Sequence, residues 1–178
     1  MVIFRKFLIL SILILMVAGC TKKEAEKHYN LALESAARGL YHKALKNFDQ
    51  AIKLNSKHAR AYLGRGNLYA LRNEYENAFQ DYNKALSIDP AMAETYTNRG
   101  NLHQVKGDLD QALADYNKAA QLDPKYANAY YNRAILYFRQ GEYEKSNQDV
   151  ASLQELGLAP DPQFAQALAK AMGQKASP

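Results

Sequence analysis

The chain has 178 residues, of which 48% are hydrophobic and 23% are charged, a balance that is ordinary for a folded protein of about one domain. Its formal net charge is +5, and the part beyond residue 19 carries 21 basic and 18 acidic residues. These charges alternate in sign along the sequence, as they do on solvated helix surfaces, and this pattern argues against a nucleic-acid-binding protein.

The first residues have the organisation of a signal peptide. Arg5 and Lys6 precede an apolar run over residues 7–16. The whole segment from residue 7 to residue 19 has 13 residues, fewer than the roughly 20 that a helix needs to span a membrane. We therefore predict a cleaved signal peptide of the lipoprotein type over residues 1–19.

The next feature is the sequence Val17-Ala18-Gly19-Cys20. An aliphatic residue, two small residues and a cysteine in this order resemble the lipobox of bacterial lipoproteins. The resemblance implies that Cys20 receives a diacylglycerol thioether and an acylated amine, commonly a palmitoyl amide. Two or three acyl chains make membrane attachment effectively permanent. Since Cys20 is the only cysteine, no intramolecular disulfide and no thiolate metal site is expected.

We expect residues 20–24 to be the lipidated cysteine and a short tether, because helix-forming sequence begins at Glu24. Lys22 and Lys23 in this tether either contact anionic headgroups or act as solubilising residues. In a cell with two membranes, Thr21 after the cysteine resembles the sorting pattern of outer-membrane lipoproteins. This implies a location on the outer membrane, facing the periplasm. In a cell with one membrane, the anchor implies the exterior of the cell membrane.

Beyond the tether, the sequence repeats with a period of 34 residues. Residues 93–124 nearly reproduce residues 59–90, and a further copy begins at residue 127. Such a period indicates stacked supersecondary units, none of which buries its apolar face alone. Within one copy, Tyr62, Gly66 and Tyr69 have the i, i+4, i+7 spacing of one helical face. The small residue between two aromatic residues allows a second helix to approach closely.

The repeated letters resemble the tetratricopeptide (TPR) pattern, which has an aromatic residue, Gly or Ala, Tyr, Ala, an aromatic residue and Pro at fixed offsets. In the third copy these positions hold Tyr96, Gly100, His103, Ala112, Tyr116 and Pro124. The resemblance implies an all-α fold, a TPR solenoid of four helical hairpins with a C-terminal capping helix. We predict TPR 1 at 25–58, TPR 2 at 59–92, TPR 3 at 93–126, TPR 4 at 127–160, the capping helix at 161–173 and a tail at 174–178.

Three repeats carry an arginine before the small residue and an aspartate 16 residues later, and the first repeat lacks both. Because they are present and absent together, we predict intra-repeat ion pairs between the two helices of each hairpin, although the arginines could alternatively form an anion site. The pairs are Arg65 with Asp81, Arg99 with Asp115, and Arg133 with Asp149, whereas the first repeat has Leu31 and Asn47.

TPR arrays resemble one another in binding extended peptides or partner helices on the concave face formed by their first helices. We expect Asn67 with Asn98, and Asn101 with Asn132, to form a ladder across adjacent helices on this face. These asparagines offer both donors and acceptors to a peptide backbone, or are consensus residues without a ligand role. The apolar residues of the last repeat form an anchor pocket, or pack under the capping helix. The predicted face holds Leu63, Asn67, Thr97, Asn98, Asn101, Gln104, Tyr131, Asn132, Ile135 and Phe138.

No pattern in the sequence indicates catalysis, and we predict no enzyme, cofactor or metal site. The four histidines are never paired at metal-ligand spacing, and there is no glycine-rich phosphate loop. The positions at which a chaperone-type TPR clamp needs Lys and Arg hold other residues. The sequence thus predicts a membrane-anchored adaptor for a protein or peptide partner in the cell envelope, in assembly of a pilus secretin or of cell-wall machinery. The alternative is a module that associates with further copies of itself.

Overall fold

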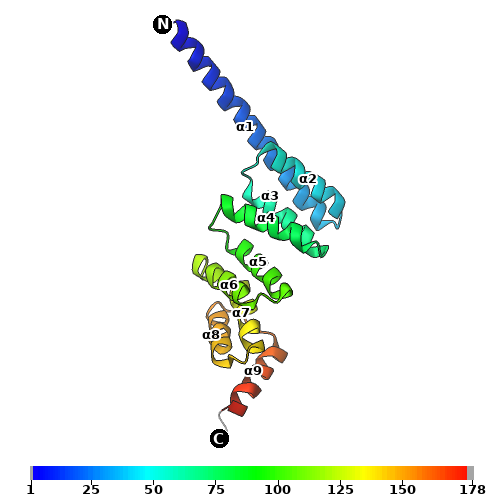
Figure 1. Cartoon of the computed structure of the whole chain (residues 1–178), viewed down its shortest axis with the longest axis vertical. Helices are drawn as coiled ribbons and strands as arrows, with labels where there is room; N and C mark the ends of the chain where they lie inside the picture. The colour runs from blue at the N-terminus through cyan, green and yellow to red at the C-terminus, as the bar shows by residue number, and fades with distance from the viewer. Residues whose placement is uncertain (1, 176–178) are drawn as a thin grey trace. The chain divides into compact units, whose positions relative to one another are not determined.

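The computed structural model describes the backbone of residues 2–175 and the side chains of residues 19–173, and every regular element in that part of the chain is an α-helix (Figure 1). The chain divides into two units, Met1–Asp89 and Pro90–Pro178. The first unit contains α1 (Val2–Ala37), α2 (Tyr41–Leu54), α3 (Ala59–Leu71) and α4 (Tyr75–Ile88). The second contains α5 (Ala93–Lys106), α6 (Leu109–Leu122), α7 (Ala127–Arg139), α8 (Tyr143–Glu155) and α9 (Pro162–Lys175).

Helix α1 begins earlier than the sequence predicted. It runs continuously through Cys20 and Glu24, so the residues predicted as a tether have helical backbone. Lys and Glu in this segment are good helix formers, and no Pro stands there to interrupt the helix. The side chains of residues 1–18 and of the tail lie outside the described residues, and the signal peptide stays a prediction. Among the residues that the structure describes, no helix is long and apolar enough to cross a membrane.

The turns inside the hairpins repeat one backbone conformation. At the same position of the repeat, Gly107 has φ +86° and Asn73 has φ +61°. Gly carries no Cβ penalty in this left-handed region, and Asn is the residue that most often replaces it. In the α5–α6 turn, the Asp108 N–H donates to the His103 carbonyl at 2.9 Å. This gives a hydrogen-bond donor to a carbonyl in the last turn of α5. The turn residues in the sequence therefore mark the middle of each hairpin.

The ends of the second helices also follow from the sequence. Helices α4 and α6 end at Ile88 and Leu122, and each is followed by an Asp-Pro pair. A proline pushes the residue before it out of the helical region, so the helix stops there. These two boundaries lie where the repeat pattern predicted them.

In the second unit, a small residue on α5 accommodates an aromatic side chain of α6. A Cβ added to Gly100 would lie 2.7 Å from Cε1 of Tyr116, closer than carbon atoms can approach. Tyr116 is fully buried as a result, together with Ala112 and Leu136. In the first unit, Gly66 stands in the same relation to Tyr82. This close packing is the physical reason for the alternation of small and aromatic residues.

Helix α9 caps the last hairpin. Its Leu168 is only 2% exposed and packs with Ala134 and Val150. Burying a leucine side chain contributes about 1.5–3 kcal/mol to stability. The predicted capping helix therefore covers apolar surface that the fourth hairpin would otherwise expose to water.

Candidate functional site

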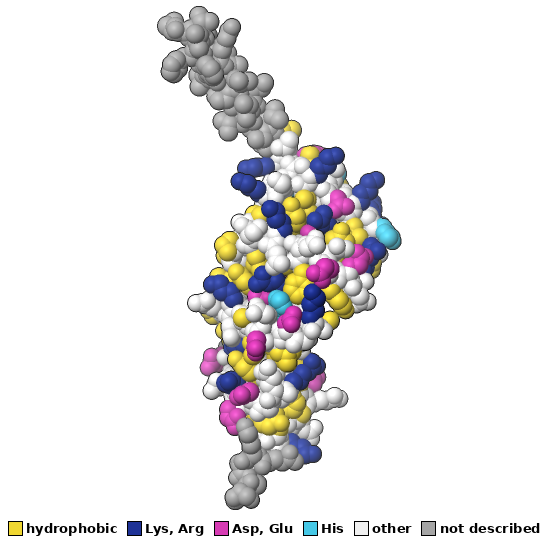
Figure 2. Space-filling model, viewed as in Figure 1, with side chains coloured by type: hydrophobic (Ala, Val, Ile, Leu, Met, Phe, Trp, Pro, Cys, Tyr) yellow, Lys and Arg dark blue, Asp and Glu magenta, His cyan; other side chains and the backbone are white. Residues whose placement is uncertain are grey.

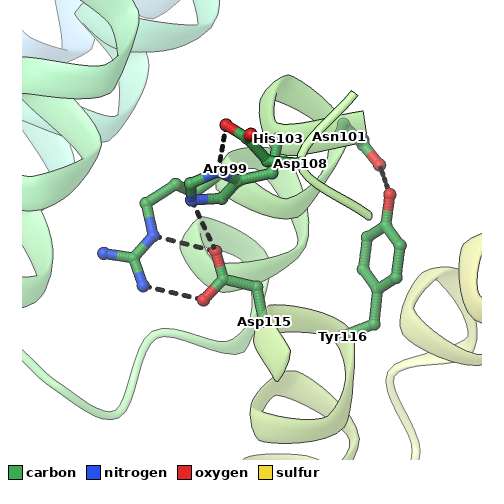
Figure 3. Close-up of polar contacts among 6 residues, drawn as sticks. All are labelled: Arg99, Asn101, His103, Asp108, Asp115 and Tyr116. Atoms are coloured by element: carbon green, nitrogen blue, oxygen red, sulfur yellow. Dashed lines mark hydrogen bonds and ion pairs between the residues drawn. The ribbon is translucent and has the colours of Figure 1, made fainter. Parts of the chain in front are cut away.

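Arginines of three first helices bind aspartates of the second helices. Nε of Arg99 donates to Oδ2 of Asp115 at 2.9 Å, and Nη2 donates to Oδ1 at 2.7 Å (Figure 3). This fork is bidentate, the strongest geometry for such a pair. The structure likewise brings Arg65 to Asp81 at 2.8 and 2.7 Å, and Arg133 to Asp149 at 2.9 and 2.5 Å.

Arg65 and Arg133 each have a second partner that the sequence analysis missed. Nη1 of Arg65 donates to Asp49 at 2.6 Å, and Nη1 of Arg133 donates to Asn117 at 2.6 Å. Both partners lie 16 residues before the arginine, in the preceding hairpin. The same 16-residue spacing, counted backwards, is the signal that could have revealed them. These contacts join neighbouring hairpins within each unit.

The electrostatics of the pairs agree with a structural role. Hydrogen bonding to the buried carboxylate of Asp115 raises the pKa of Arg99, against the opposing effect of burial. The pKa of Arg133 is raised in the same way by Asp149. Because carboxylates occupy the bidentate edge of each guanidinium, the structure favours the intra-repeat ion pairs over the alternative anion site.

His103 extends the pair around Arg99. Its Nε2 lies 3.9 Å from Oδ2 of Asp115, and its Nδ1 lies 3.7 Å from Oδ2 of Asp108, as Figure 3 shows. The histidine takes the place that Tyr holds in the neighbouring repeats, so packing and this polar contact explain it. In the part of the chain that the structure describes, no three His, Cys, Asp or Glu side chains are grouped to hold a metal ion.

The central polar contact of the predicted face joins α5 to α7. Nδ2 of Asn132 donates to Oδ1 of Asn101 at 3.1 Å. The same oxygen accepts a hydrogen bond from the hydroxyl of Tyr116 at 2.8 Å, and Oε1 of Gln104 lies 3.1 Å from that hydroxyl. Tyr116 is buried, so it fixes the orientation of Asn101. The buried position also raises the pKa of Tyr116, with a further contribution from Asp115.

This Asn101–Asn132 pair has hydrogen-bonding capacity left over. Among the described residues, the amide nitrogen of Asn101 and the side-chain oxygen of Asn132 make no hydrogen bond, and both side chains are half-buried. An amide donor and an amide acceptor therefore remain side by side. They are complementary to the acceptor and donor of a backbone peptide group.

The other predicted polar residues of the face are placed differently. In the first unit, Oδ1 of Asn67 accepts from the hydroxyl of Tyr82 at 2.8 Å. Asn98 is half-buried on α5. Leu63 and Thr97 are only 7% and 1% exposed. The prediction that their side chains lie on the surface of the binding face is therefore wrong. The predicted ladder from Asn67 to Asn98 stays a prediction.

The predicted anchor residues lie beside the capping helix. The ring of Phe138 packs edge-on against the ring of Phe164 at 5.6 Å between centroids, and the ring of Tyr131 does so at 6.4 Å. Phe164 belongs to α9, so of the two interpretations left open, the structure favours packing under the capping helix. Ile135 is half-buried on α7.

Cys20, the predicted lipidation site, is exposed on α1 and has a free thiol. It borders a shallow depression on the surface of α1 with Lys23, Lys27 and Leu31. The thiol is therefore exposed to solvent in this fold.

A family model described as TPR repeat matches residues 66–107 and 105–141, so the central part of the chain consists of TPR repeats. A search of the curated proteins found no match. Among solved structures, a crystal structure of MamA protein is 18% identical, with a TM-score of 0.71 over 86% of this chain and 83% of that one. The Arabidopsis OM64 TPR domain is 24% identical, with a TM-score of 0.64 over 67% of this chain and 98% of that one. These similarities identify the fold as an all-α TPR solenoid.

Proposed function

We propose that this chain is a membrane-anchored scaffold that binds an extended segment of a partner protein on the face formed by α5 and α7. The observation that carries the proposal is the Asn101–Asn132 pair, which keeps an unused amide donor and acceptor side by side. TPR repeats commonly serve as protein-interaction modules, which supports the same conclusion.

The chemistry of the pair defines the ligand class. Asn101 and Asn132 contact backbone groups of the segment, which gives hydrogen bonds that do not depend on the ligand's sequence. Each such bond contributes only about 0.5–1.5 kcal/mol, so the remaining affinity must come from apolar contact. Ile135 on α7 supplies part of it.

The membrane anchor in this proposal is the lipid on Cys20. It is supported by the resemblance of residues 17–20 to a lipobox and by the exposure of the thiol. A bacterial lipoprotein of this kind acts in the assembly of an envelope complex, such as pilus secretins or cell-wall enzymes. A Cys20→Ser variant should be absent from the membrane fraction at mature size. Membrane retention of that variant at mature size would refute the anchor.

Site-specific photocrosslinking in intact cells tests the binding face. A photoreactive residue at Asn128, exposed and one turn before Asn132 on α7, should give a discrete crosslinked product. The same group at Gln111, exposed on α6, is the matched control and should give none. A product with twice the mass of the chain would favour the alternative of self-association. No product at Asn128 would refute the proposed face.

A further inference from the structure

Helix α2 of the first repeat carries a concentration of exposed positive charge. It holds Lys43, Lys46 and Lys53, all exposed, and one acid, Asp49. Lys46 and Lys53 are seven residues apart and so lie on the same helical face. The carboxylate of Asp49 accepts a hydrogen bond from Arg65 at 2.6 Å, which leaves the three lysines without an acid of their own helix to neutralise them. Figure 2 shows Lys and Arg side chains standing out from the surface of the first unit.

The repeat architecture does not require this charge. Three lysines and one acid give α2 a net charge of +2. The corresponding second helices α4 and α6 each hold two acids and one lysine, and α8 holds three acids and one lysine. Their net charges are therefore −1, −1 and −2. Since all four helices form the same kind of hairpin, the lysines of α2 point to a role specific to the first repeat.

The C-terminal end of α2, which carries Lys53, lies beside the start of the mature chain, whereas Lys43 and Lys46 lie towards its other end. Helices α1 and α2 are joined by the short turn at residues 38–40 and so run antiparallel, and Nδ1 of His28 lies 3.0 Å from Oδ1 of Asn47 between them. The ring of His58 contacts Glu26 at 3.1 Å, so the segment after α2, with Lys57, lies next to α1 six residues from Cys20. Six residues of helix correspond to about 9 Å. This is close to the Debye length of about 8 Å at physiological ionic strength.

We infer that the exposed face of α2 binds the anionic lipid headgroups of the membrane in which Cys20 is anchored. This inference rests on the lipid anchor proposed above and adds the surface that faces the bilayer: Lys43, Lys46, Lys53 and Lys57. A lysine near an anionic membrane surface favours the bound state by about fivefold. The anchor holds Lys53 and Lys57 nearest the headgroups, and Lys46 lies on the same face of α2 as Lys53, so these lysines together orient the first repeat on the membrane.

Spin labelling of the full processed chain in vesicles tests this inference. Ser56, exposed between Lys53 and Lys57, is replaced by Cys and carries the nitroxide. Leu158→Cys, at the same repeat position of the fourth repeat and also exposed, is the matched control. The measured quantity is the rate at which the nitroxide collides with nickel that is chelated to a lipid headgroup. It is compared between vesicles with 30% phosphatidylglycerol and pure phosphatidylcholine vesicles of about the same size.

We expect the Ser56→Cys label to collide at least about fivefold more often in the phosphatidylglycerol vesicles. A Lys46→Gln/Lys53→Gln/Lys57→Gln background, or about 1 M salt, should remove the difference, and the Leu158→Cys label should show none. In the unsubstituted chain, a Cys20 that does not take up the label shows that the lipid anchor is present. If it is present and the collision rates are equal in both kinds of vesicle, this inference alone is overturned. A Cys20 thiol that takes up the label would overturn the anchor, and the inference with it.

Discussion

Replacement of Arg99 by Leu should destabilise the protein through the carboxylate that it leaves behind. Asp115 is 5% exposed and receives two hydrogen bonds from Arg99, at 2.9 and 2.7 Å. Without the guanidinium, a charge that is almost shielded from water loses its counterion. The first repeat has Leu31 and Asn47 at the corresponding positions and still forms a hairpin. The double variant Arg99→Leu/Asp115→Asn should therefore be far less damaged than the sum of its parts.

The structure sets the expected magnitudes. Loss of one partner of a buried pair costs about 3–5 kcal/mol, and Arg99→Leu should fall near 3 kcal/mol. The cost should lie at the lower end of this range because Nε2 of His103 lies 3.9 Å from the Asp115 carboxylate and can take the place of Arg99 as its partner. Asp115→Asn should cost about 1–2 kcal/mol, since the Arg99 side chain is 23% exposed and reaches water. With about 2 kcal/mol for the double variant, the coupling free energy is about 2–3 kcal/mol.

Urea unfolding of the four proteins of this cycle measures the coupling, provided that the dependence on urea concentration stays the same among them. The matched control is a cycle on Glu34 and Arg38, an ion pair of 3.3 Å whose side chains are 62% and 67% exposed. Its coupling should be at most about 0.5 kcal/mol. If Arg99 and Asp115 couple no more strongly than Glu34 and Arg38, the reasoning from burial is wrong.

Three further predictions concern the second unit. Gly100→Ala should destabilise by about 1–3 kcal/mol because its Cβ would meet Tyr116, whereas Gly173→Ala, with open space at the Cβ, should be neutral or slightly stabilising by thermal unfolding. Phe164→Ala should speed backbone hydrogen exchange in α9 by about tenfold or more, since it removes contacts with Phe138 and Tyr131; unchanged exchange would mean that these contacts do not hold α9. Tyr116→Phe should be about 1 kcal/mol less stable than the wild type at pH 7. The raised pKa of Tyr116 in the folded protein means that its stabilisation is complete below about pH 10, the unfolded value, and is lost as pH rises further, so the two proteins should converge there in chemical denaturation.

The sequence was sufficient to predict the hairpins, because burial imposes a strict pattern on it. The 34-residue period and the Asp-Pro pairs located the helices, and the spacing from Arg99 to Asp115 located an ion pair between them. The continuation of α1 through residues 20–24 could not be predicted, since this segment rich in Lys and Glu carries no burial pattern that marks a helix boundary.

The candidate site could be predicted only in part. A period shows which residues share a face, but it does not show how their side chains pair across helices. The hydroxyl of Tyr116 and the amide of Asn132 meet on one oxygen of Asn101, which depends on side-chain rotamers. The position of Phe164 against Phe138 depends on how α9 packs, and α9 has no following helix in the repeat pattern to compare it with.

The dissociation constant of the crosslinked partner segment, measured for an Asn101→Ala/Asn132→Ala variant, tests the proposed function most directly. The matched control is Gln111→Ala/Gln148→Ala, two exposed positions on the second helices. Loss of the amides on the α5–α7 face should weaken binding about 10-fold or more, at about one hydrogen bond per residue, while the melting temperature stays within a few degrees of the wild type. Unchanged binding by the asparagine variant would show that this face is not where the partner binds.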